Sequence, residues 1–550
     1  MKRRNFIKLS ATASAIGLSP IEIHATLEPL LSLSCPNVSN RKLVLINLSG
    51  GNDGLNTVIP LDQYSTYANL RPNIKIPETG GLTYLNLDTS LPSNQQIGLN
   101  PALTGLKSLY DAGWLRILQS VGYPSQNRSH FKSGDIYMTG NDGESNLNGS
   151  DSGWIGRFME LYYPSEITEP YPLAIQIGSD KTSLGFHGIE EHGLSLNLTG
   201  QDPAGFYSVL NGLGGQAPTT FPNSDFGTEL AFISGVDALS NTHASSISNA
   251  FNSGTNATTY PDTDLADQLK TVAKLISGNL KTKVYMVRIS GFDTHNNQIQ
   301  GVDDPLGKHY NLLNELSEAI TAFVNDLNQQ GIGEDVSGLT YSEFGRKAGE
   351  NGNMGTDHGQ ISPAFVFGEA IEGGVSGLNV DLSEATSGNN FQISVVQHDY
   401  RQTVATLLQD FLGAQNSVID STFFNYSSLP SATSFTTSKI DELIKPLSKV
   451  SEECLNKTLA INEFDTTPKE LKRWQVYPNP FRDIITIFGL EEVYEIEYKI
   501  INSTGSTILV DKLVVNGASV KINLSNLIGG MYFIQIKKGF YRELHKIIKI

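Results

Sequence analysis

The sequence predicts an α/β fold, in which a mainly parallel sheet is flanked by helices, followed by a small C-terminal all-β sandwich domain. Short apolar runs recur between residues 40 and 415, and stretches with helical spacing of apolar residues lie between them. Residues 471–550 instead carry short segments of alternating polarity separated by turn residues. The chain has 550 residues, more than one ordinary domain, so two folded parts are expected.

The predicted strands of the main domain are continuous apolar runs, which is the pattern of parallel strands buried on both faces. Apolar residues spaced by three and four predict helices at 311–327 and 401–412. Strands that alternate with helices favour a parallel sheet, and ligands of such sheets collect at the carboxyl ends of the strands. The predicted strands cover residues 42–48, 115–121, 171–177, 284–289, 339–342 and 364–367.

The C-terminal part is predicted to be a sandwich because its strands are short and alternate in polarity. The preceding residues 416–470 are rich in Ser and Thr, and we expect a closing segment and linker there. The predicted strands of the sandwich cover residues 484–488, 498–502, 506–510, 520–524 and 531–537.

Charge and cysteine content narrow the classes of function. The formal net charge is −17, and no dense basic cluster follows the first residues, so nucleic-acid binding is not expected. The only cysteines are Cys35 and Cys454, too few for a cysteine-rich zinc site. Any metal would therefore be held by histidines and carboxylates. The sequence is compatible both with a disulfide between the two cysteines and with two unrelated free thiols.

The N-terminus is predicted to be a removable export signal covering residues 1–25. Arg3 and Arg4 precede Phe6, Lys8 and a mildly apolar stretch, a pattern that resembles a twin-arginine signal. A Sec-type signal is the alternative, and both place the mature protein outside the cytoplasm. The apolar stretch is too short for a transmembrane span, so none is expected.

Polar loops with carboxylate and imidazole groups follow the predicted strands. Because carboxyl ends of parallel strands meet at one edge of a sheet, these loops predict one shared metal site. Alternatives remain at three places: the turn around Asp53 forms well without metal, Asp293 and His295 could lie in a surface turn, and Glu343 could brace the site through Arg346 instead of binding metal. The candidate ligands are Asp53, Asp293, His295, Glu343, Asp357 and His358.

A candidate nucleophile lies in the segment Asn-Arg-Ser-His-Phe, between a predicted strand and a predicted helix. Ser129 at a helix N-terminus would face backbone amides that stabilise an alkoxide or an incoming oxyanion. An ordinary helix cap is the alternative for this residue. His130 is predicted to act as a general acid or substrate contact, and Arg128 to hold an anionic group.

Five motifs in order, LSGGNDGLNTVIP, NRSHF, GFDTH, SEFGR and GTDHG, resemble the bacterial family called domain of unknown function 1501. The resemblance covers about residues 42–415 and implies a relative of the alkaline phosphatase and sulfatase superfamily. It therefore implies a doubly wound α/β sheet, one or two divalent metals, and attack on phosphate or sulfate esters. Residue by residue, the resemblance also gives His398 as a candidate for the last histidine ligand.

The chain departs from that superfamily in three respects. The mid-chain pair, Asp293 and His295, is more tightly spaced than the Asp-x-x-x-His pair of phosphodiesterase relatives. No Cys-x-Pro-Ser-Arg segment occurs, so formylglycine chemistry is not expected. Glu343 stands directly after its predicted strand, where sulfatases carry the Asp-His pair, and Asp357 and His358 follow a loop later. Which of the two loops binds metal is therefore open. Histidine and carboxylate ligands together suit Zn or Mn or, with more oxygen ligands, Mg or Ca.

The tail begins with Tyr-Pro-Asn-Pro and later reads Gly-Gly-Met-Tyr-Phe before a basic finish, which resembles the type A sorting domain of the type IX secretion system. This resemblance implies passage through the periplasm to the outer-membrane surface or the extracellular space, with the type IX secretion machinery as partner. An ordinary carbohydrate-binding or adhesive β-domain is the alternative.

Together these observations predict a secreted or cell-surface metal-dependent hydrolase of phosphate or sulfate esters. Its substrate would be a small or glycan-linked anionic ester. The alternative from a different class is a catalytically silent sulfatase-like protein that serves as a surface binding or structural component.

Overall fold

The structure is a computed structural model and consists of two compact units. The predicted export signal at 1–25 and parts of the predicted linker at 416–470 lie outside the described residues. The described residues are 35–143, 152–167, 169–178, 184–188, 195–198, 242–302, 304–423, 439–452, 454–455, 474–488, 494–502, 507–515, 519–538 and 541–550.

The first unit is built on a nine-stranded sheet with the order β11-β5-β10-β9-β1-β8-β6-β7, and β12 pairs with β5. The neighbours β9, β1, β8, β6 and β7 are parallel, whereas β10 runs antiparallel to β9 and to β5. The predicted mainly parallel sheet is confirmed. The strands are β1 (Lys42–Ser49), β5 (Leu115–Gly122), β6 (Ala174–Ile177), β7 (Ser195–Leu198), β8 (Val284–Ser290), β9 (Val336–Tyr341), β10 (Ser362–Phe367), β11 (Gly374–Ser376) and β12 (His398–Asp399).

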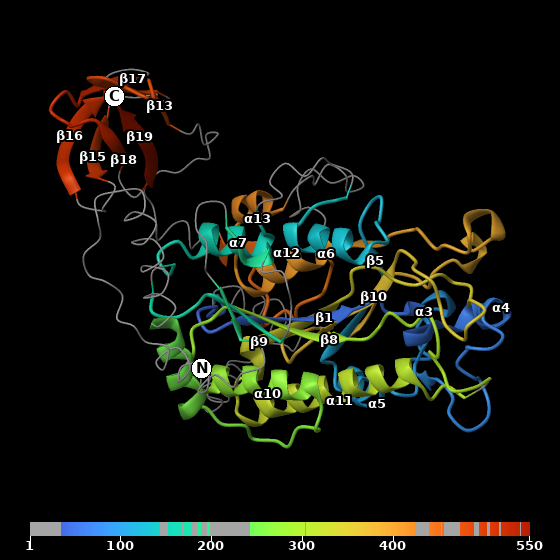
Figure 1. The fold of residues 1–550 in the computed structure, drawn as a ribbon. Helices are drawn as coiled ribbons and strands as arrows, with labels where there is room; N and C mark the ends of the chain where they lie inside the picture. The colour runs from blue at the N-terminus through green and yellow to red at the C-terminus, as the bar shows by residue number, and fades with distance from the viewer. Residues whose placement is uncertain are drawn as a thin grey trace, which may run out of the picture. The chain divides into compact units, whose positions relative to one another are not determined.

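Side chains of the central strand β1 alternate between two hydrophobic cores, one on each face of the sheet. Val44 and Ile46 belong to one core, and Leu43 and Leu45 to the other. Helices cover both faces (Figure 1). On the first face lie α5 (Thr104–Asp111), α10 (Asp264–Ser277) and α11 (Lys308–Gln329), and on the second α6 (His130–Thr139), α7 (Trp154–Tyr162), α12 (Tyr400–Thr406) and α13 (Asn416–Thr422).

Local sequence explains where the main helices begin. The Thr263 side chain caps α10 by accepting from the amide of Ala266. Asp399 and Gln402 form a capping box at the start of α12. The helix predicted at 401–412 is α12 followed by a π-helical turn over Leu407–Phe411.

A small layer precedes β5 in the chain. It holds two short helices, α3 (Gly54–Thr57) and α4 (Tyr64–Leu70), and a separate three-stranded sheet in the order β2-β4-β3. These strands have only two or three residues, too few for a polarity pattern, so the sequence did not reveal them. They are β2 (Val58–Pro60), β3 (Leu85–Asn86) and β4 (Ile97–Leu99).

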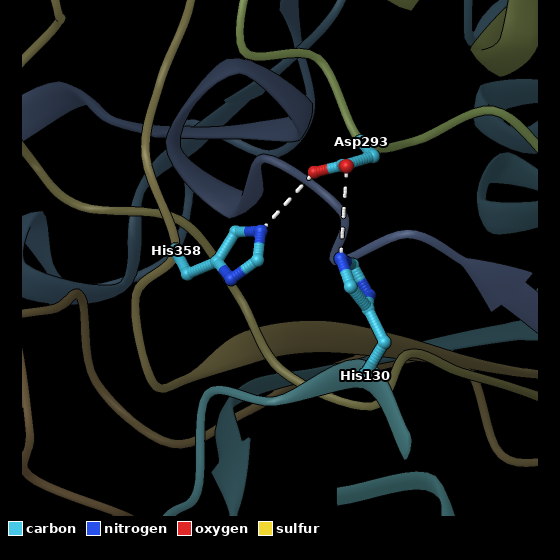
Figure 2. Close-up of side chains that lie close together, drawn as sticks. All are labelled: His130, Asp293 and His358. Atoms are coloured by element: carbon cyan, nitrogen blue, oxygen red, sulfur yellow. Dashed lines mark hydrogen bonds and ion pairs between the residues drawn. The ribbon is translucent and has the colours of Figure 1, made fainter.

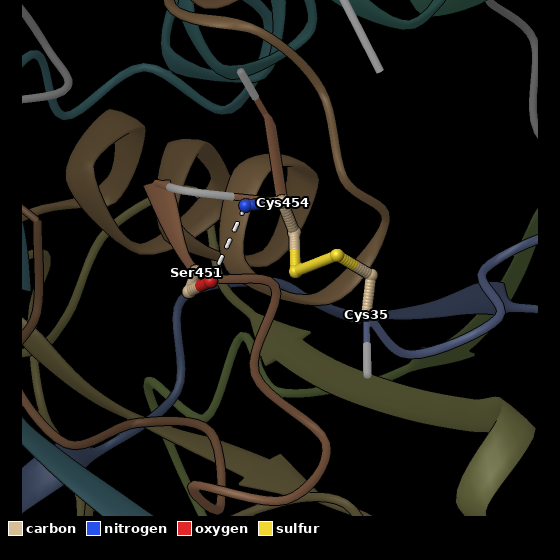
Figure 3. Close-up of a disulfide and its surroundings, with 3 residues drawn as sticks. All are labelled: Cys35, Ser451 and Cys454. Atoms are coloured by element: carbon tan, nitrogen blue, oxygen red, sulfur yellow. Dashed lines mark hydrogen bonds between the residues drawn. A yellow bond between two sulfur atoms is a disulfide. The ribbon is translucent and has the colours of Figure 1, made fainter. Parts of the chain in front are cut away.

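Cys35 and Cys454 form a disulfide across a sequence separation of 419 residues (Figure 3). Beside it, Val38 packs against a small apolar group that contains Val450 and Leu455. Of the two alternatives open from the sequence, the structure therefore has the disulfide. The bond joins the segment before β1 to the segment after α13, so it closes the first unit covalently.

The second unit consists of two antiparallel sheets, in the orders β13-β14-β17 and β16-β15-β18-β19. Alternating residues such as Ile485, Ile496 and Ile534 are fully buried between them. The predicted C-terminal all-β region is confirmed, and β13 and β19 are additions to the predicted strands. The strands are β13 (Gln475–Tyr477), β14 (Ile484–Phe488), β15 (Tyr494–Asn502), β16 (Thr507–Val515), β17 (Ser519–Asn523), β18 (Gly530–Lys538) and β19 (Tyr541–Lys549).

Within the described residues, no helix is both long enough and apolar enough to cross a membrane.

Candidate metal centre

Five polar segments meet at one edge of the large sheet because of its topology. The parallel neighbours β9, β1 and β8 all end at this edge. β5 runs in the same direction, since β10 is antiparallel to both β9 and β5. For the same reason β10 begins at this edge, so the segment that carries Asp357 and His358 arrives where the other loops depart. The Gly359 N–H donates to Gly345 O over 2.8 Å and holds this segment beside the loop after β9.

Glycines allow the backbones of these loops to approach one another closely. Gly50 has φ of +121°, and a Cβ there would lie 2.3 Å from the Asp293 nitrogen. At Gly355, a Cβ would lie 2.4 Å from the Thr294 carbonyl oxygen. Any larger residue at either position would push the histidine- and aspartate-bearing loops apart.

The imidazoles of His130 and His358 face the carboxylate of Asp293 from two sides (Figure 2). His358 Nε2 lies 3.2 Å from Asp293 Oδ1, and His130 Nε2 lies 3.6 Å from Asp293 Oδ2. His295 completes the group: its Nε2 is 3.2 Å from Asp293 Oδ1 and 3.0 Å from His358 Nε2. Three imidazoles and one carboxylate thus converge within the described residues.

The Nδ1 atoms of two of these imidazoles are held by acceptors. His358 Nδ1 lies 2.9 Å from the Arg128 carbonyl oxygen, and His295 Nδ1 lies 3.2 Å from Asp357 Oδ1. A carbonyl or a carboxylate only accepts, so a proton on each Nδ1 would leave the two Nε2 lone pairs pointing at each other and at Asp293. The Asp293 carboxylate also accepts only, so either a proton on Nε2 or a cation between these atoms would satisfy the cluster.

Asp293 remains ionised at neutral pH. Burial alone would raise its pKa, but the hydrogen bond and charge of Arg346, followed by the contacts with His358 and His295, lower the pKa to about 2. Arg346 Nη2 lies 2.6 Å from Asp293 Oδ1. The same guanidinium donates to the carbonyl oxygens of Gly50, Gly51, Phe292 and Thr356, and so ties the loops together.

His130 and Glu343 form a second pair at this edge. His130 Nδ1 lies 2.8 Å from Glu343 Oε1, which also accepts from the Gly50 amide over 2.8 Å. The hydrogen bond to Glu343 raises the pKa of His130 above its ordinary value. Burial, in contrast, lowers the pKa of His358 below its ordinary value. The two rings therefore have different proton affinities.

The geometry of His295, His358 and Asp293 fits a bound divalent ion. In a tetrahedral site with bonds of 2.0–2.1 Å, ligand atoms lie about 3.3 Å from one another. The three distances among the two Nε2 atoms and Asp293 Oδ1 are 3.0, 3.2 and 3.2 Å. Two imidazoles with one carboxylate leave a fourth position open, as catalytic zinc sites do.

Asp53 lies outside this cluster of ligand atoms. Its side chain is fully buried and forms an ion pair with Arg71 at 2.6 Å. Burial alone would raise the pKa of Asp53, but Arg71, helped by His309 and Gln298, lowers it. Its Oδ1 is buried and has no hydrogen-bond partner among the described residues. A buried orphan oxygen of this kind is compatible with a cation or a water beside it.

Ser129 and Arg128 are exposed residues that lie next to the cluster in the chain. Ser129 is the N-cap residue of α6, but its side chain makes no cap hydrogen bond. Its backbone amide instead donates to Asn127 Oδ1 over 2.8 Å. The Arg128 carbonyl holds His358, and its side chain is on the surface. The serine hydroxyl is therefore available for other contacts.

The remaining predicted site residues lie behind or away from the cluster. Asp357 braces His295 through Oδ1 and pairs with Lys347 through Oδ2 at 3.2 Å. Glu343 Oε2 is buried without a hydrogen-bond partner among the described residues. His398 lies on β12 with its Nδ1 2.7 Å from the Gln119 carbonyl oxygen, and it is not part of the cluster.

Sequence reasoning missed three residues that support these loops. Arg71 donates to the Ala348 and Lys347 carbonyl oxygens as well as to Asp53. Asn351 Nδ2 donates to the His295 carbonyl oxygen and to Asp357 Oδ1. Gln298 donates to Asp53. No local pattern marks such residues, because each acts across long sequence separations.

Two family descriptions match parts of the chain. "Protein of unknown function (DUF1501)" matches residues 254–411, a segment that contains Asp293, His295 and His358. Asp53 and Ser129 lie before the matched residues. "Secretion system C-terminal sorting domain" matches residues 475–550, which confirms the predicted sorting tail and the predicted export to the cell surface or extracellular space. No curated protein matches the chain.

Several solved structures show a distant similarity. A protein in the alkaline phosphatase superfamily from Vibrio parahaemolyticus has 10% identity and a TM-score of 0.29, covering 70% of this chain and 71% of that one. The PsFucS1 sulfatase from Pseudoalteromonas sp. has 11% identity and a TM-score of 0.29, covering 92% and 89%. Dimeric latent PorU from Porphyromonas gingivalis has 15% identity and a TM-score of 0.12; the match covers 14% of this chain and only 9% of PorU. The chain thus has a segment, residues 254–411, that matches the DUF1501 description and carries Asp293, His295 and His358, and a second segment, residues 475–550, that matches a secretion sorting domain.

Proposed function

We propose that this protein is an exported, metal-dependent hydrolase of phosphate or sulfate esters. The observation that carries the proposal is the convergence of two imidazole Nε2 atoms and one carboxylate oxygen within 3.0–3.2 Å of one another. The Nδ1 atoms of the two imidazoles face away from that point, toward acceptors. Such an outer layer orients metal-binding histidines.

Asp293, His295 and His358 would hold the ion directly, while Asp357 supports His295 from behind and Glu343 supports the neighbouring His130. A divalent ion bound there would stabilise negative charge that develops on an ester oxygen. Two nitrogens and one oxygen suit Zn or Mn better than Mg or Ca, which prefer oxygen ligands. Asp53, with its orphan Oδ1, is the candidate for a further contact to an ion.

The neighbouring residues Arg128, Ser129 and His130 would carry out ester cleavage. Ser129 Oγ would attack the phosphorus or sulfur atom, forming a serine ester and breaking the bond to the alcohol. The serine proton would pass to His130, which Glu343 holds by Nδ1, and from there to the departing alcohol oxygen. Water would then release the phosphate or sulfate. Arg128 would pair with the anionic group.

The sorting domain supports an extracellular or surface substrate, such as a small or glycan-linked anionic ester, and contact with the type IX secretion machinery. Transit would begin at the N-terminal twin-arginine-type signal. We also propose the boundaries 40–415 for the catalytic domain, 416–470 for the closing segment and linker, and 471–550 for the sorting domain.

One observation favours the alternative, a catalytically silent surface protein. Arg346 already places a positive charge 2.6 Å from Asp293 Oδ1, the oxygen nearest both His295 and His358. A permanent guanidinium can neutralise this carboxylate without any metal. In that case the cluster would be a structural polar network at the loop junction.

Metal analysis of the purified full-length protein, together with a panel of aryl phosphates and aryl sulfates, separates the two functions. The hydrolase predicts about one or two equivalents of a divalent transition metal and turnover that a chelator abolishes. Absence of both metal and turnover, in protein incubated with Zn²⁺ or Mn²⁺, would leave the silent surface protein as the explanation.

A further inference from the structure

We propose that Gln298 is the positioning residue of the metal centre, because it holds the two loops that carry His295 and His358 in register with each other. This inference rests on the proposed function, since it takes these imidazoles to be metal ligands. Gln298 lies in the loop after β8, and its side chain is fully buried.

Both ends of the Gln298 amide are used. Its Nε2 donates to Asp53 Oδ2 over 2.5 Å. Its Oε1 accepts from Thr294 Oγ1 over 3.0 Å and from Thr356 Oγ1 over 3.1 Å. A single amide oxygen therefore joins two loops that lie far apart in the sequence.

The two threonines stand next to the proposed ligands. Thr294 lies between Asp293 and His295 in the chain, and Thr356 lies two residues before His358. Three backbone hydrogen bonds also join the two loops: Thr356 N to Thr294 O at 3.1 Å, Gln298 N to Met354 O at 2.9 Å and Asn297 N to Asn353 O at 3.3 Å. The Gln298 side chain adds one bond across the loops, to Thr356, and one within its own loop, to Thr294. Its amide oxygen thus links the residues beside His295 and His358 directly.

The charge of Asp53 decides which way the Gln298 amide points. A carboxylate can only accept, so the NH₂ end must face Asp53 and the oxygen must face the threonines. Arg71 keeps Asp53 ionised by pairing with it at 2.6 Å inside the fold. Asp53 thus acts on the imidazole loops through Gln298, whether or not it also contacts an ion.

A matched control is available in Gln409, which is also buried but lies in the π-helical turn after α12. Its Nε2 donates to Asn416 Oδ1 over 2.5 Å, and Asn416 begins α13. Gln298→Met and Gln409→Met each remove a buried amide of the same size. Only the first touches the imidazole loops.

The test measures the Zn²⁺ dissociation constant of the full-length protein by competition with a chromophoric chelator. Gln298→Met is expected to weaken Zn²⁺ binding by about 10–100-fold, the usual effect of losing a residue that orients ligands. Gln409→Met should change it by less than about threefold, although both variants lower the Tm of the metal-free protein. The milder variant Thr294→Val/Thr356→Val should weaken Zn²⁺ binding as much as Gln298→Met does. Adding Gln298→Met to it should weaken Zn²⁺ binding little further, because both changes remove the same hydrogen bonds.

Hydrogen exchange of the Thr356 amide in metal-free protein gives a second readout. Exchange should accelerate in Gln298→Met and not in Gln409→Met. If the wild-type protein binds Zn²⁺ and Gln298→Met binds it equally well, the positioning role is wrong. If the wild type binds no divalent metal, the proposed function fails. Hydrogen exchange of the Thr356 amide is then the remaining test of the positioning role, and unchanged exchange in Gln298→Met overturns that role as well.

Discussion

The Nε2 atoms of His295 and His358 lie 3.0 Å apart, although the two residues belong to loops that follow β8 and precede β10. An acceptor lies behind the Nδ1 atom of each ring, and a proton on both Nδ1 atoms would leave two Nε2 lone pairs facing each other. Such an arrangement is unfavourable unless a proton or a metal ion lies between the rings. This relationship makes His358 the most informative residue to change.

His358→Ala is expected to abolish stoichiometric binding of divalent metal, because it removes one of three converging ligand atoms. Metal content after dialysis, measured by atomic emission, checks this. His398→Ala is the control, since His398 lies on β12 and outside the cluster. Equal loss of metal in both variants would show that the ligand set is different from the one proposed here.

Ser129→Ala is expected to lower turnover of an aryl ester by roughly 10³-fold or more while leaving the metal content unchanged, because the nucleophile is not a ligand. Steady-state rates and metal analysis on the same sample test this. Ser125→Ala, in the same loop, should keep most of the activity. Full activity in Ser129→Ala would remove serine from the mechanism and point to direct attack by water.

Arg71→Met is expected to destabilise the fold by about 3–5 kcal/mol, because it leaves the Asp53 carboxylate buried and unpaired. Asp53→Asn in the same chain should restore part of that loss. Lys107 and Asp111 form a partly exposed pair on α5, so Lys107→Met should change stability by less than about 1 kcal/mol. Denaturant unfolding of metal-free protein measures all three, and equal effects of the two single variants would contradict the importance of the buried pair.

The pH dependence of stability should contain a contribution from His309. Burial lowers the pKa of His309 to about 4, whereas the unfolded chain should titrate near 6.5. Between these values the unfolded state binds the proton first, so stability is full above pH 6.5 and falls as the pH drops toward 4, by about 3 kcal/mol. Urea midpoints between pH 7 and 4 should fall less steeply in His309→Gln. Identical slopes would mean that the folded state protonates His309 as readily as the unfolded chain.

Reduction of the Cys35–Cys454 disulfide should lower the stability of the first unit by about 2–5 kcal/mol. The bond closes a long loop and so reduces the conformational entropy of the unfolded chain. The Tm with and without a reductant measures this. Cys35→Ser/Cys454→Ser should reproduce the reduced protein and become insensitive to the reductant. Metal binding should stay the same, since neither cysteine belongs to the histidine cluster.

Much of the fold could be predicted because its signals are local. The run 42–48 is apolar at nearly every position, as a strand with both faces buried must be, and the structure has β1 there between β9 and β8. The spacing of apolar residues at 311–327 marked the buried face of α11. β11 and β12 escaped prediction because strands of two or three residues carry no pattern. The antiparallel direction of β10 also has no local signal.

The sequence by itself indicated which loops carry the polar chemistry, since glycine, aspartate and histidine follow strand ends in a recognisable order. Only the tertiary structure decided which of those groups face the centre of the cluster and which lie behind them. The antiparallel β10 brings Asp357 and His358 back to the edge where Glu343 already lies, so both loops contribute. His358 faces Asp293, while Asp357 and Glu343 stand behind His295 and His130. The side of an imidazole that faces inward depends on which acceptor lies behind it, and such acceptors come from distant parts of the chain.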